Sequence, residues 1–238
     1  MNITITPDEH FNRGVAQQIA QQVLMKPDSV LCISTGTTAT PIFDELVILK
    51  RELNLDFSKV FAFNVDEYVG VDSDDPASCY WRAKKEFYSP LGFSEDRFYI
   101  PNAKENDMDE GLERFQAVLD KLNGIDLLFL AVGGNGHIAF NEPGTPFDSG
   151  LYSAKLTKTT IDAKKDMFGG EDKVPEYGIT MGIRSLMQAK KILVAARGAH
   201  KADIMKASLY GPITTEVPAS VLQLHPFVDV IIDKSAAG

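Results

Sequence analysis

Two carboxylates stand directly after an apolar run. The segment V-F-A-F-N-V, Val60–Val65, has the composition of a buried strand, and Asp66 and Glu67 follow it at once. Carboxylates at the end of a buried strand are unfavourable unless they are solvated or paired. In a cleft, loss of solvation raises the pKa of such a group, which suits a base that moves a proton at carbon. The residues alone leave open that both acids cap a turn or lie in water.

A histidine follows a glycine turn after a second apolar run. The run Ile125–Val132 leads into G-G-N-G-H, which ends at His137, and Glu142 lies five residues further on. The glycines allow a tight turn that exposes backbone amides, and a nearby carboxylate can fix the tautomer of the imidazole and tune its basicity. A lone histidine is more often structural, but its place beside a glycine turn and a carboxylate indicates acid–base chemistry.

The histidine and cysteine content argues against two other chemistries. The chain has four His and two Cys, and contains neither H-E-x-x-H nor C-x-x-C, which disfavours a zinc site. It contains no G-x-S-x-G elbow, which disfavours a Ser–His–Asp hydrolase. We therefore expect no metal ligands.

A loop rich in hydroxyl groups follows a third apolar run, Val30–Ile33, and precedes a helix. Its glycine lets the backbone approach a ligand closely, and the helix after it offers free N–H groups and the positive end of its dipole. This suits a phosphate monoester, although a polar turn with a helix cap is the alternative. The loop is neither a Walker loop nor a dinucleotide fingerprint. The candidate phosphate ligands are Ser34, Thr35, Gly36, Thr37 and Thr38.

These clusters lie in an alternation of apolar runs and amphipathic segments. We expect strands at Val30–Ser34, Val60–Val65, Ile125–Val132, Ile192–Ala196 and Val228–Ile232, and helices at Asp8–Met25, Ala39–Lys50, Asp75–Tyr88, Met108–Leu122 and Ala199–Leu209. Such alternation predicts an α/β fold whose parallel sheet is covered on both faces, in one domain spanning 1–238. The stretch Thr145–Gly178 is the least regular and is expected to be a hairpin insertion or a mobile lid. Ligands of such sheets bind at the carboxyl ends of the strands, where the polar clusters stand.

Composition narrows the partners and the compartment. The 238 residues carry a formal charge of −9, which argues against a non-specific nucleic-acid binder. Cys32 and Cys79 are expected to be free thiols in a reducing compartment. The N-terminal segment lacks the features of a signal peptide, and the longest apolar run is too short to span a bilayer. We therefore expect a cytoplasmic protein with no membrane partner.

Six segments in a fixed order carry a resemblance to a known family. They are S-T-G-T-T near Ser34, F-N-V-D-E-Y-V-G at Phe63–Gly70, G-N-G-H-I-A-F-N-E-P-G at Gly134–Gly144, G-I-T-M-G at Gly178–Gly182, G-A-H-K-A at Gly198–Ala202, and V-P-A-S-V-L-Q-L-H-P at Val217–Pro226. Together they resemble the glucosamine-6-phosphate deaminase family. The resemblance implies a Rossmann-like three-layer α/β/α sandwich, shared with ribose-5-phosphate isomerase relatives. It also implies cofactor-independent conversion of glucosamine 6-phosphate or galactosamine 6-phosphate to a ketohexose 6-phosphate and ammonia.

The resemblance also implies roles for particular residues. His137, oriented by Glu142, matches the group that moves a proton during opening of the sugar ring. Asp66 matches the base that carries a proton between C2 and C1. Amides near Gly136 are expected to stabilise the developing oxyanion. Lys201 matches a phosphate ligand, together with the amides and hydroxyls of the loop that begins at Ser34.

Two positions depart from the family pattern. Asn135 stands where many members have an aspartate, so it can bond the imidazole but brings no negative charge. The segment I-D-A-K-K-D-M-F places Asp166 where the family has a phosphate-binding arginine. We expect Lys164 or Lys165 to replace it and include Lys165 in the site, although lysine lacks the bidentate fork. This stretch is more similar to the galactosamine-6-phosphate isomerase branch, which leaves the sugar epimer open.

Two alternatives share the fold. The 6-phosphogluconolactonase branch tends to carry D-E-R and G-H-T-A-S-L-F-P where this chain has D-E-Y and G-H-I-A-F-N-E-P. A sugar-phosphate-binding regulator without activity is the other alternative, and retention of Asp66, His137 and Glu142 argues against it. Because the last apolar strand is followed by only a short tail, we expect a monomer or small homo-oligomer without allosteric activation by an N-acetylated sugar phosphate.

Overall fold

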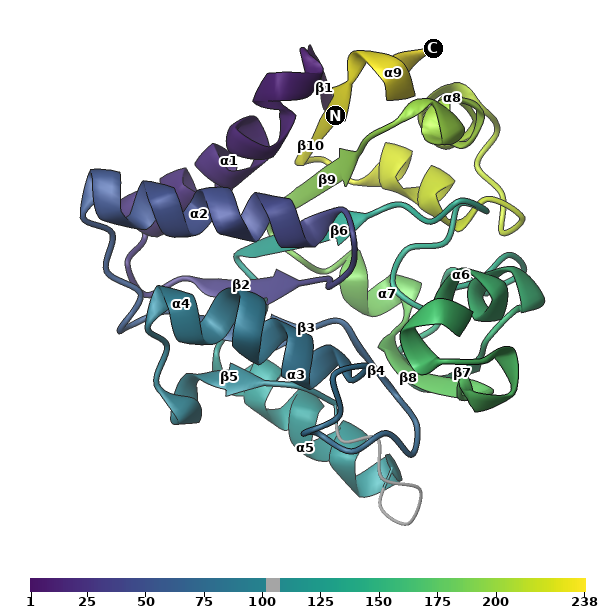
Figure 1. Ribbon diagram of the computed structural model, residues 1–238, viewed down its shortest axis with the longest axis horizontal. Coiled ribbons are helices and arrows are strands. Elements are labelled where there is room, and N and C mark those ends of the chain that lie inside the picture. Colours follow the sequence, from purple (N-terminus) through teal and green to yellow (C-terminus); the bar gives the residue numbers. More distant parts are fainter. Residues whose placement is uncertain (102–107) are drawn as a thin grey trace.

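A seven-stranded parallel sheet runs through the middle of the molecule (Figure 1). The computed structural model describes residues 1–101 and 108–238. All five expected strands lie in this sheet, which confirms the α/β class with a mostly parallel sheet. Across the sheet the strands are β1 (Asn2–Thr6), β10 (Val228–Asp233), β9 (Ile192–Ala196), β6 (Leu127–Ala131), β2 (Val30–Ile33), β3 (Phe61–Asn64) and β5 (Phe98–Tyr99).

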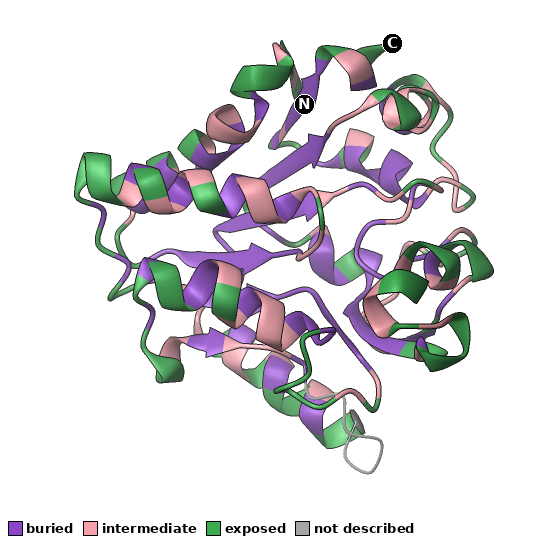
Figure 2. Ribbon diagram, in the orientation of Figure 1, coloured by how far each residue is buried: buried purple, intermediate pink, exposed green. Residues whose placement is uncertain are grey.

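The central strands are apolar on both faces because each face meets its own layer of helices. In β6, Leu127 and Phe129 pack into one hydrophobic cluster, whereas Leu128 and Leu130 pack into the other. This is the period-two alternation of a strand, with neither face left to water. Figure 2 shows the strands buried and the outward faces of many helices exposed.

Two layers of helices cover the sheet. One face is covered by α1 (Phe11–Met25), α2 (Ala39–Leu53), α3 (Cys79–Ala83), a π-helical turn at Lys84–Tyr88 and α4 (Ser89–Leu91). The other face is covered by α5 (Met108–Lys121), α7 (Ile183–Leu186), α8 (Ala202–Tyr210), a 3₁₀ segment at Pro218–Leu224 and α9 (Lys234–Ala237). Shorter 3₁₀ turns occupy Asp8–His10, Glu95–Arg97, Glu171–Lys173 and Ala199–Lys201. No helix within the described ranges has the length and apolar content needed to traverse a membrane.

A second, antiparallel sheet was not expected from the sequence. It contains β4 (Asp66–Tyr68), β8 (Tyr177–Met181) and β7 (Leu151–Lys155), in that order. The helix α6 (Lys158–Phe168) connects β7 to β8 and packs on this sheet through a cluster that includes Tyr68 and Phe140. The stretch Thr145–Gly178 therefore contains β7, α6 and the start of β8, and the two acids after β3 belong to the separate strand β4.

The expected helix at Asp75–Tyr88 begins later than predicted. Residues before Cys79 form turns, because the amide of Asp75 bonds the carbonyl of Asp72 and the amide of Ser78 bonds the carbonyl of Asp75. Ser78 then caps α3 by accepting from the amide of Trp81 at 3.2 Å.

Candidate active site

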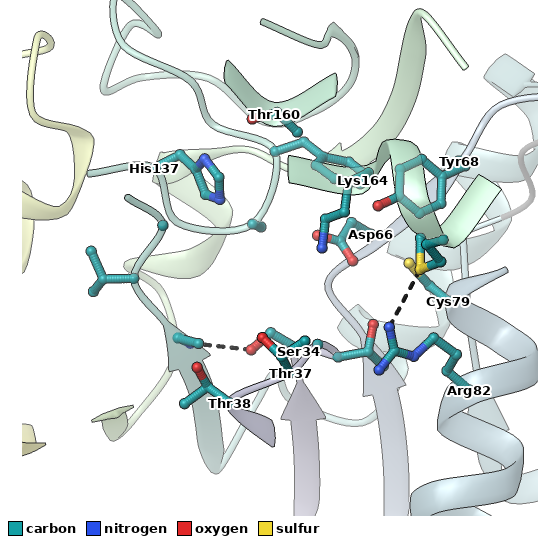
Figure 3. Close-up of a pocket in the computed structure, with 18 of the residues that line it drawn as sticks. Ser34, Thr37, Thr38, Asp66, Tyr68, Cys79, Arg82, His137, Thr160 and Lys164 are labelled. Carbon is teal, nitrogen blue, oxygen red and sulfur yellow. Dashed lines mark hydrogen bonds between the residues drawn. The ribbon is translucent and has the colours of Figure 1, made fainter. Parts of the chain in front are cut away.

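Four strands of the parallel sheet end around one cavity of about 140 Å³ (Figure 3). The ends of β2, β3, β6 and β9 meet here because carboxyl ends of parallel strands share one edge of a sheet. Helices α3 and α6 complete the wall. The lining includes Ser34, Thr35, Gly36, Thr37, Thr38, Asp66, Tyr68, Cys79, Arg82, Gly133, His137, Thr160, Lys164, Met167 and Lys201.

The loop at residues 34–38 presents open amides to this cavity. The hydroxyl of Ser34 accepts from the amide of Ala131 at 3.2 Å, which fixes the loop to β6. Thr38 precedes α2 but makes no side-chain cap. Among the described residues, no acceptor bonds the N–H groups of residues 35–38. Gly36 has φ +139°, a conformation that favours glycine. Open backbone amides before a helix are the kind of geometry that can bind an anion.

Asp66 is a buried carboxyl group on the wall of the cavity, with a relative exposure of 7%. Burial, followed by the charge of Glu67, raises the pKa of Asp66 to about 7, against the opposing effects of Lys164 and Cys79. A carboxyl group with such a pKa accepts and returns protons near neutral pH.

Glu67 points away from the cavity and holds the start of α3. One of its carboxylate oxygens accepts from the amides of Tyr68 and Cys79 at 2.8 and 2.9 Å. The other oxygen accepts from the hydroxyl of Ser78 and the amide of Tyr80, both at 2.8 Å. A carboxylate at a helix N-terminus meets free N–H groups and a favourable dipole. The two neighbouring acids therefore have different tasks.

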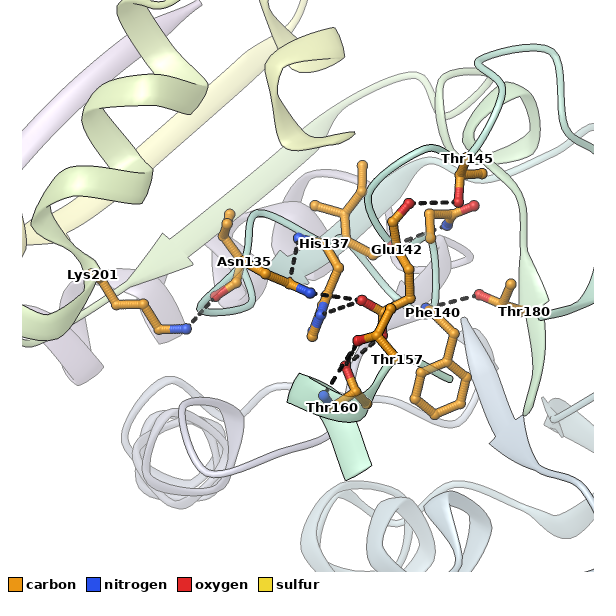
Figure 4. Close-up of polar contacts among 12 residues, drawn as sticks. Asn135, His137, Phe140, Glu142, Thr145, Thr157, Thr160, Thr180 and Lys201 are labelled. Atoms are coloured by element: carbon orange, nitrogen blue, oxygen red, sulfur yellow. Dashed lines mark hydrogen bonds and ion pairs between the residues drawn. The ribbon is translucent and has the colours of Figure 1, made fainter. Parts of the chain in front are cut away.

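His137 lies on the wall with Glu142 behind it (Figure 4). Nδ1 of His137 is buried, has no hydrogen-bond partner among the described residues, and lies 3.5 Å from Oε2 of Glu142. Burial acts to raise the pKa of Glu142, but the proximity of His137 and the hydrogen bonds from Thr160 and Asn135 outweigh it and lower the pKa to about 2. A β-carbon at Gly133 would lie 2.3 Å from Nε2 of His137, so only glycine leaves room for the ring.

The structure corrects the expected contacts of two turn residues. Asn135 does not bond the imidazole: its amide group donates to Oε2 of Glu142 at 2.8 Å, and its oxygen accepts from the backbone amide of His137 at 3.2 Å. The amide of Gly136 closes the turn on the carbonyl of Gly133 at 3.1 Å, and Gly136 is not on the cavity wall. The turn thus consumes the amide that was expected to face an oxyanion.

Three cations approach the cavity, and one of them was missed. Lys201 lines the wall and donates to the carbonyl of Val132 at 2.8 Å. Lys164 lines the wall, whereas the expected Lys165 is exposed and lies outside it, because the phase of α6 turns Lys165 outward. Arg82 on α3 also faces the cavity. No sequence motif marks Arg82 as a site residue. It lies three residues after Cys79 on α3, and both side chains line the cavity.

The chain belongs to the family described as glucosamine-6-phosphate isomerases/6-phosphogluconolactonase. The sequence model of that family matches residues 8–230. Among curated relatives, a glucosamine-6-phosphate deaminase of Thermoanaerobacter pseudethanolicus is 38% identical over 238 residues, covering all of this chain and 94% of the relative. A glucosamine-6-phosphate deaminase of Lactobacillus johnsonii is 41% identical over 237 residues, covering 100% of this chain and 96% of the relative.

Solved structures agree with this assignment. A monomeric glucosamine-6-phosphate deaminase superposes with a TM-score of 0.96 at 35% identity, covering 100% of this chain and 99% of that one. A 6-phosphogluconolactonase from Thermotoga maritima superposes with a TM-score of 0.75 at 17% identity, covering 98% of this chain and 99% of that one. At that identity the second likeness shows the shared fold alone.

Proposed function

We propose that this protein is an amino-sugar 6-phosphate deaminase, which converts glucosamine 6-phosphate and water to a ketohexose 6-phosphate and ammonia. One observation carries the proposal: a buried carboxyl group with a pKa of about 7, an imidazole–carboxylate pair and a loop of open amides line one small cavity. The relatives named glucosamine-6-phosphate deaminase over the full length of the chain support it.

The proposed reaction begins with ring opening. His137 takes the proton of the C1 hydroxyl and a proton is returned to the ring oxygen, which frees an aldehyde at C1. The negative charge of Glu142, whose Oε2 lies 3.5 Å from Nδ1, stabilises the transient imidazolium of His137. The ring atom that would face the sugar is Nε2, because Nδ1 is buried against Glu142.

Proton transfer at carbon follows. Asp66 removes the proton from C2, and the C1 oxygen takes a proton from solvent, so an enol with the amino group on C2 forms. Asp66 then delivers its proton to C1, and C2 becomes an imine. Water adds to the imine and ammonia leaves, so the net change is hydrolysis of a carbon–nitrogen bond. The substrate's own carbonyl and amino groups take up the electrons, so these steps require no cofactor or metal.

The phosphate group is assigned to the amides of residues 35–38 with Lys201. Lys164 and Arg82 add positive charge to the same cavity. Burial, followed by the charge of Lys164, lowers the pKa of Lys201, and both lysines line the cavity. A dianionic phosphate between them relieves the repulsion of their charges.

Three further expectations belong to this proposal. The protein acts as a monomer, as one structurally similar deaminase does. It works in the cytoplasm, where the buried free thiols Cys32 and Cys79 stay reduced. Its substrate is glucosamine 6-phosphate, with the galactosamine epimer as the alternative.

The test is ammonia release by the purified protein from glucosamine 6-phosphate and from galactosamine 6-phosphate, measured in parallel with 6-phosphogluconolactone hydrolysis. We expect release from the first sugar at the higher kcat/KM, and no lactone hydrolysis above background. Faster release from galactosamine 6-phosphate would reassign the epimer. Binding of both sugars without release would replace the enzyme with a sugar-phosphate-binding protein.

A further inference from the structure

Helix α6 presents one face to the cavity, beside three other polar groups of the site. Thr160, Lys164 and Met167 all line the cavity and are spaced four and three residues apart, which places them on one side of a helix. Lys164 acts on the charge of Asp66. The sulfur of Met167 accepts from Arg82 at 3.4 Å. Figure 3 shows Thr160 and Lys164 on this wall, with Lys164 beside Asp66.

The hydroxyl of Thr160 bonds the carboxylate behind the histidine. Thr160 has a relative exposure of 2%, and its Oγ1 donates to Oε1 of Glu142 (Figure 4). The same hydroxyl accepts from that of Thr157, the N-cap of α6, at 3.4 Å. A buried hydroxyl needs such partners. The Thr160 hydroxyl is therefore oriented by two partners, Glu142 as its acceptor and Thr157 as its donor.

Each oxygen of Glu142 has a different donor. Oε1 accepts from Thr160, whereas Oε2 accepts from Asn135 and lies 3.5 Å from Nδ1 of His137. The terminal torsion of a glutamate is soft, so a carboxylate with donors on one oxygen only can rotate. Donors on both oxygens fix its plane. Without Thr160, Oε1 would be a buried acceptor with no partner from α6.

We infer that Thr160 is a positioning residue: its hydroxyl holds Glu142 in the orientation that keeps the proton of neutral His137 on Nδ1. Nε2 is left free to accept a proton from the sugar. The catalytic consequence rests on the proposed function, whereas the tautomer of His137 does not.

A purely packing role for Thr160 predicts a different outcome. Valine has the shape of threonine but no hydroxyl, and serine has the hydroxyl but no methyl group. Thr159 is the neighbouring β-branched residue on α6 and is exposed, so Thr159→Val is a matched control for helix propensity. The other charged or titratable side chains near His137 and Glu142, among the described residues, are unchanged in these variants: Asp66, Tyr68, Cys79, Arg82, Tyr152, Lys164 and Lys201.

The first experiment records ¹⁵N spectra of the His137 ring across pH, in the protein without substrate. In the wild type we expect neutral His137 as the Nδ1–H tautomer. In Thr160→Val we expect a mixture of tautomers, with Thr160→Ser and Thr159→Val like the wild type. Wild-type spectra for Thr160→Val, or altered spectra for Thr160→Ser, would overturn the inference. Thr160→Ala, for which we expect the same mixture, replaces Thr160→Val if the valine variant does not fold.

The second experiment measures ammonia release by the same variants. We expect kcat of Thr160→Val to fall about tenfold, a part of the factor that general acid–base catalysis contributes, with KM within about twofold of wild type. An equal loss in Thr159→Val would show a helix effect and contradict the inference. If the wild type itself released no ammonia, the proposed function would fail, but the ring spectra would still decide the role of Thr160.

Discussion

Asp66 and Glu142 are two carboxyl groups of one site whose pKa values are displaced in opposite directions. Burial and the charge of Glu67 raise the pKa of Asp66. Burial also acts to raise the pKa of Glu142, but the proximity of His137 and the hydrogen bonds from Thr160 and Asn135 outweigh it. Near neutral pH, Asp66 can therefore exchange protons while Glu142 stays charged. The surroundings of the two carboxyl groups therefore favour Asp66 over Glu142 as the base of the proposed reaction.

The pH dependence of turnover should report Asp66. We expect kcat/KM for deamination to rise with pH through an apparent pKa near 7, because only ionised Asp66 removes the C2 proton. Lys164 lowers the pKa of Asp66, so Lys164→Met should move this limb to higher pH. Lys165→Met, which changes the exposed neighbour, should leave it in place. If the apparent pKa of kcat/KM did not move in Lys164→Met, or moved equally in both variants, Lys164 would not be the group that lowers the pKa of Asp66.

Lys201 should act on binding of the phosphate. We expect Lys201→Ala to raise KM about 10–100-fold, as loss of a charge-assisted hydrogen bond does, with a smaller change in kcat. Lys206→Ala is the matched control, because Lys206 is an exposed lysine of α8, the helix that begins directly after Lys201. An unaltered KM in Lys201→Ala would show that the phosphate lies elsewhere.

At the scale of elements, helix α3 is attached to the site through its first turn. Glu67 on β4 accepts from the amides of Cys79 and Tyr80 and from the cap residue Ser78. The same helix carries Arg82 to the cavity. The orientation of α3, and with it the position of Arg82, therefore depends on one buried carboxylate.

Replacement of that carboxylate should affect both stability and pH dependence. Glu67→Gln leaves one oxygen where two accepted, so we expect a loss of about 1–3 kcal/mol in the free energy of unfolding, the range for a buried polar group without its partner. The charge that helps to raise the pKa of Asp66 also disappears, so the acid limb should move to lower pH. Glu95→Gln, on an exposed ion pair with Lys84, should change neither. Urea unfolding and kcat/KM profiles measure the two effects.

The elements differ in how well the sequence predicts them. Strands buried on both faces are continuous apolar runs, so β9 is predicted with its observed ends and β2, β3, β6 and β10 to within about two residues. The strands β1, β4, β5 and β7 lie at sheet edges or are very short, and have no such run. Which of Lys164 and Lys165 lines the cavity depends on the rotational position of α6 about its axis, which the sequence does not give. The contacts of Arg82 depend on tertiary packing. Sequence motifs mark Asp66 and His137 because glycine turns and strand ends are local features.

At the scale of the whole molecule, the cavity lies between the two sheets and requires both. The amide of Val65 bonds the carbonyl of Ile33, and the amide of Met181 bonds the carbonyl of Val65, so the sheets share backbone bonds. The large sheet positions the loop at residues 34–38 and His137. The small sheet and α6 position Asp66 and Lys164. We therefore propose that residues 1–238 form one domain, which unfolds as a unit.

Glu142 should contribute to the acid stability of that unit. Its pKa is lowered from 4.5 to about 2, so the folded state favours the charged form. The resulting stability is fully present above the unfolded pKa and is lost as pH falls through the folded one. We expect the free energy of unfolding to decrease between about pH 4.5 and pH 2, and Glu142→Gln to flatten this slope. Equal slopes in the two proteins, measured by urea unfolding, would contradict the assigned network.

The most direct test of Asp66 as the base is deuterium transfer during turnover of glucosamine 6-phosphate in deuterated water. We predict that the wild type releases ammonia and places solvent deuterium on C1 of the product, because Asp66 exchanges its proton with solvent in at least part of the turnovers. Asp66→Asn should bind the sugar phosphate with nearly wild-type affinity but release no ammonia and exchange no C2 proton. Exchange at C2 at the wild-type rate in that variant would contradict the central claim that Asp66 is the base.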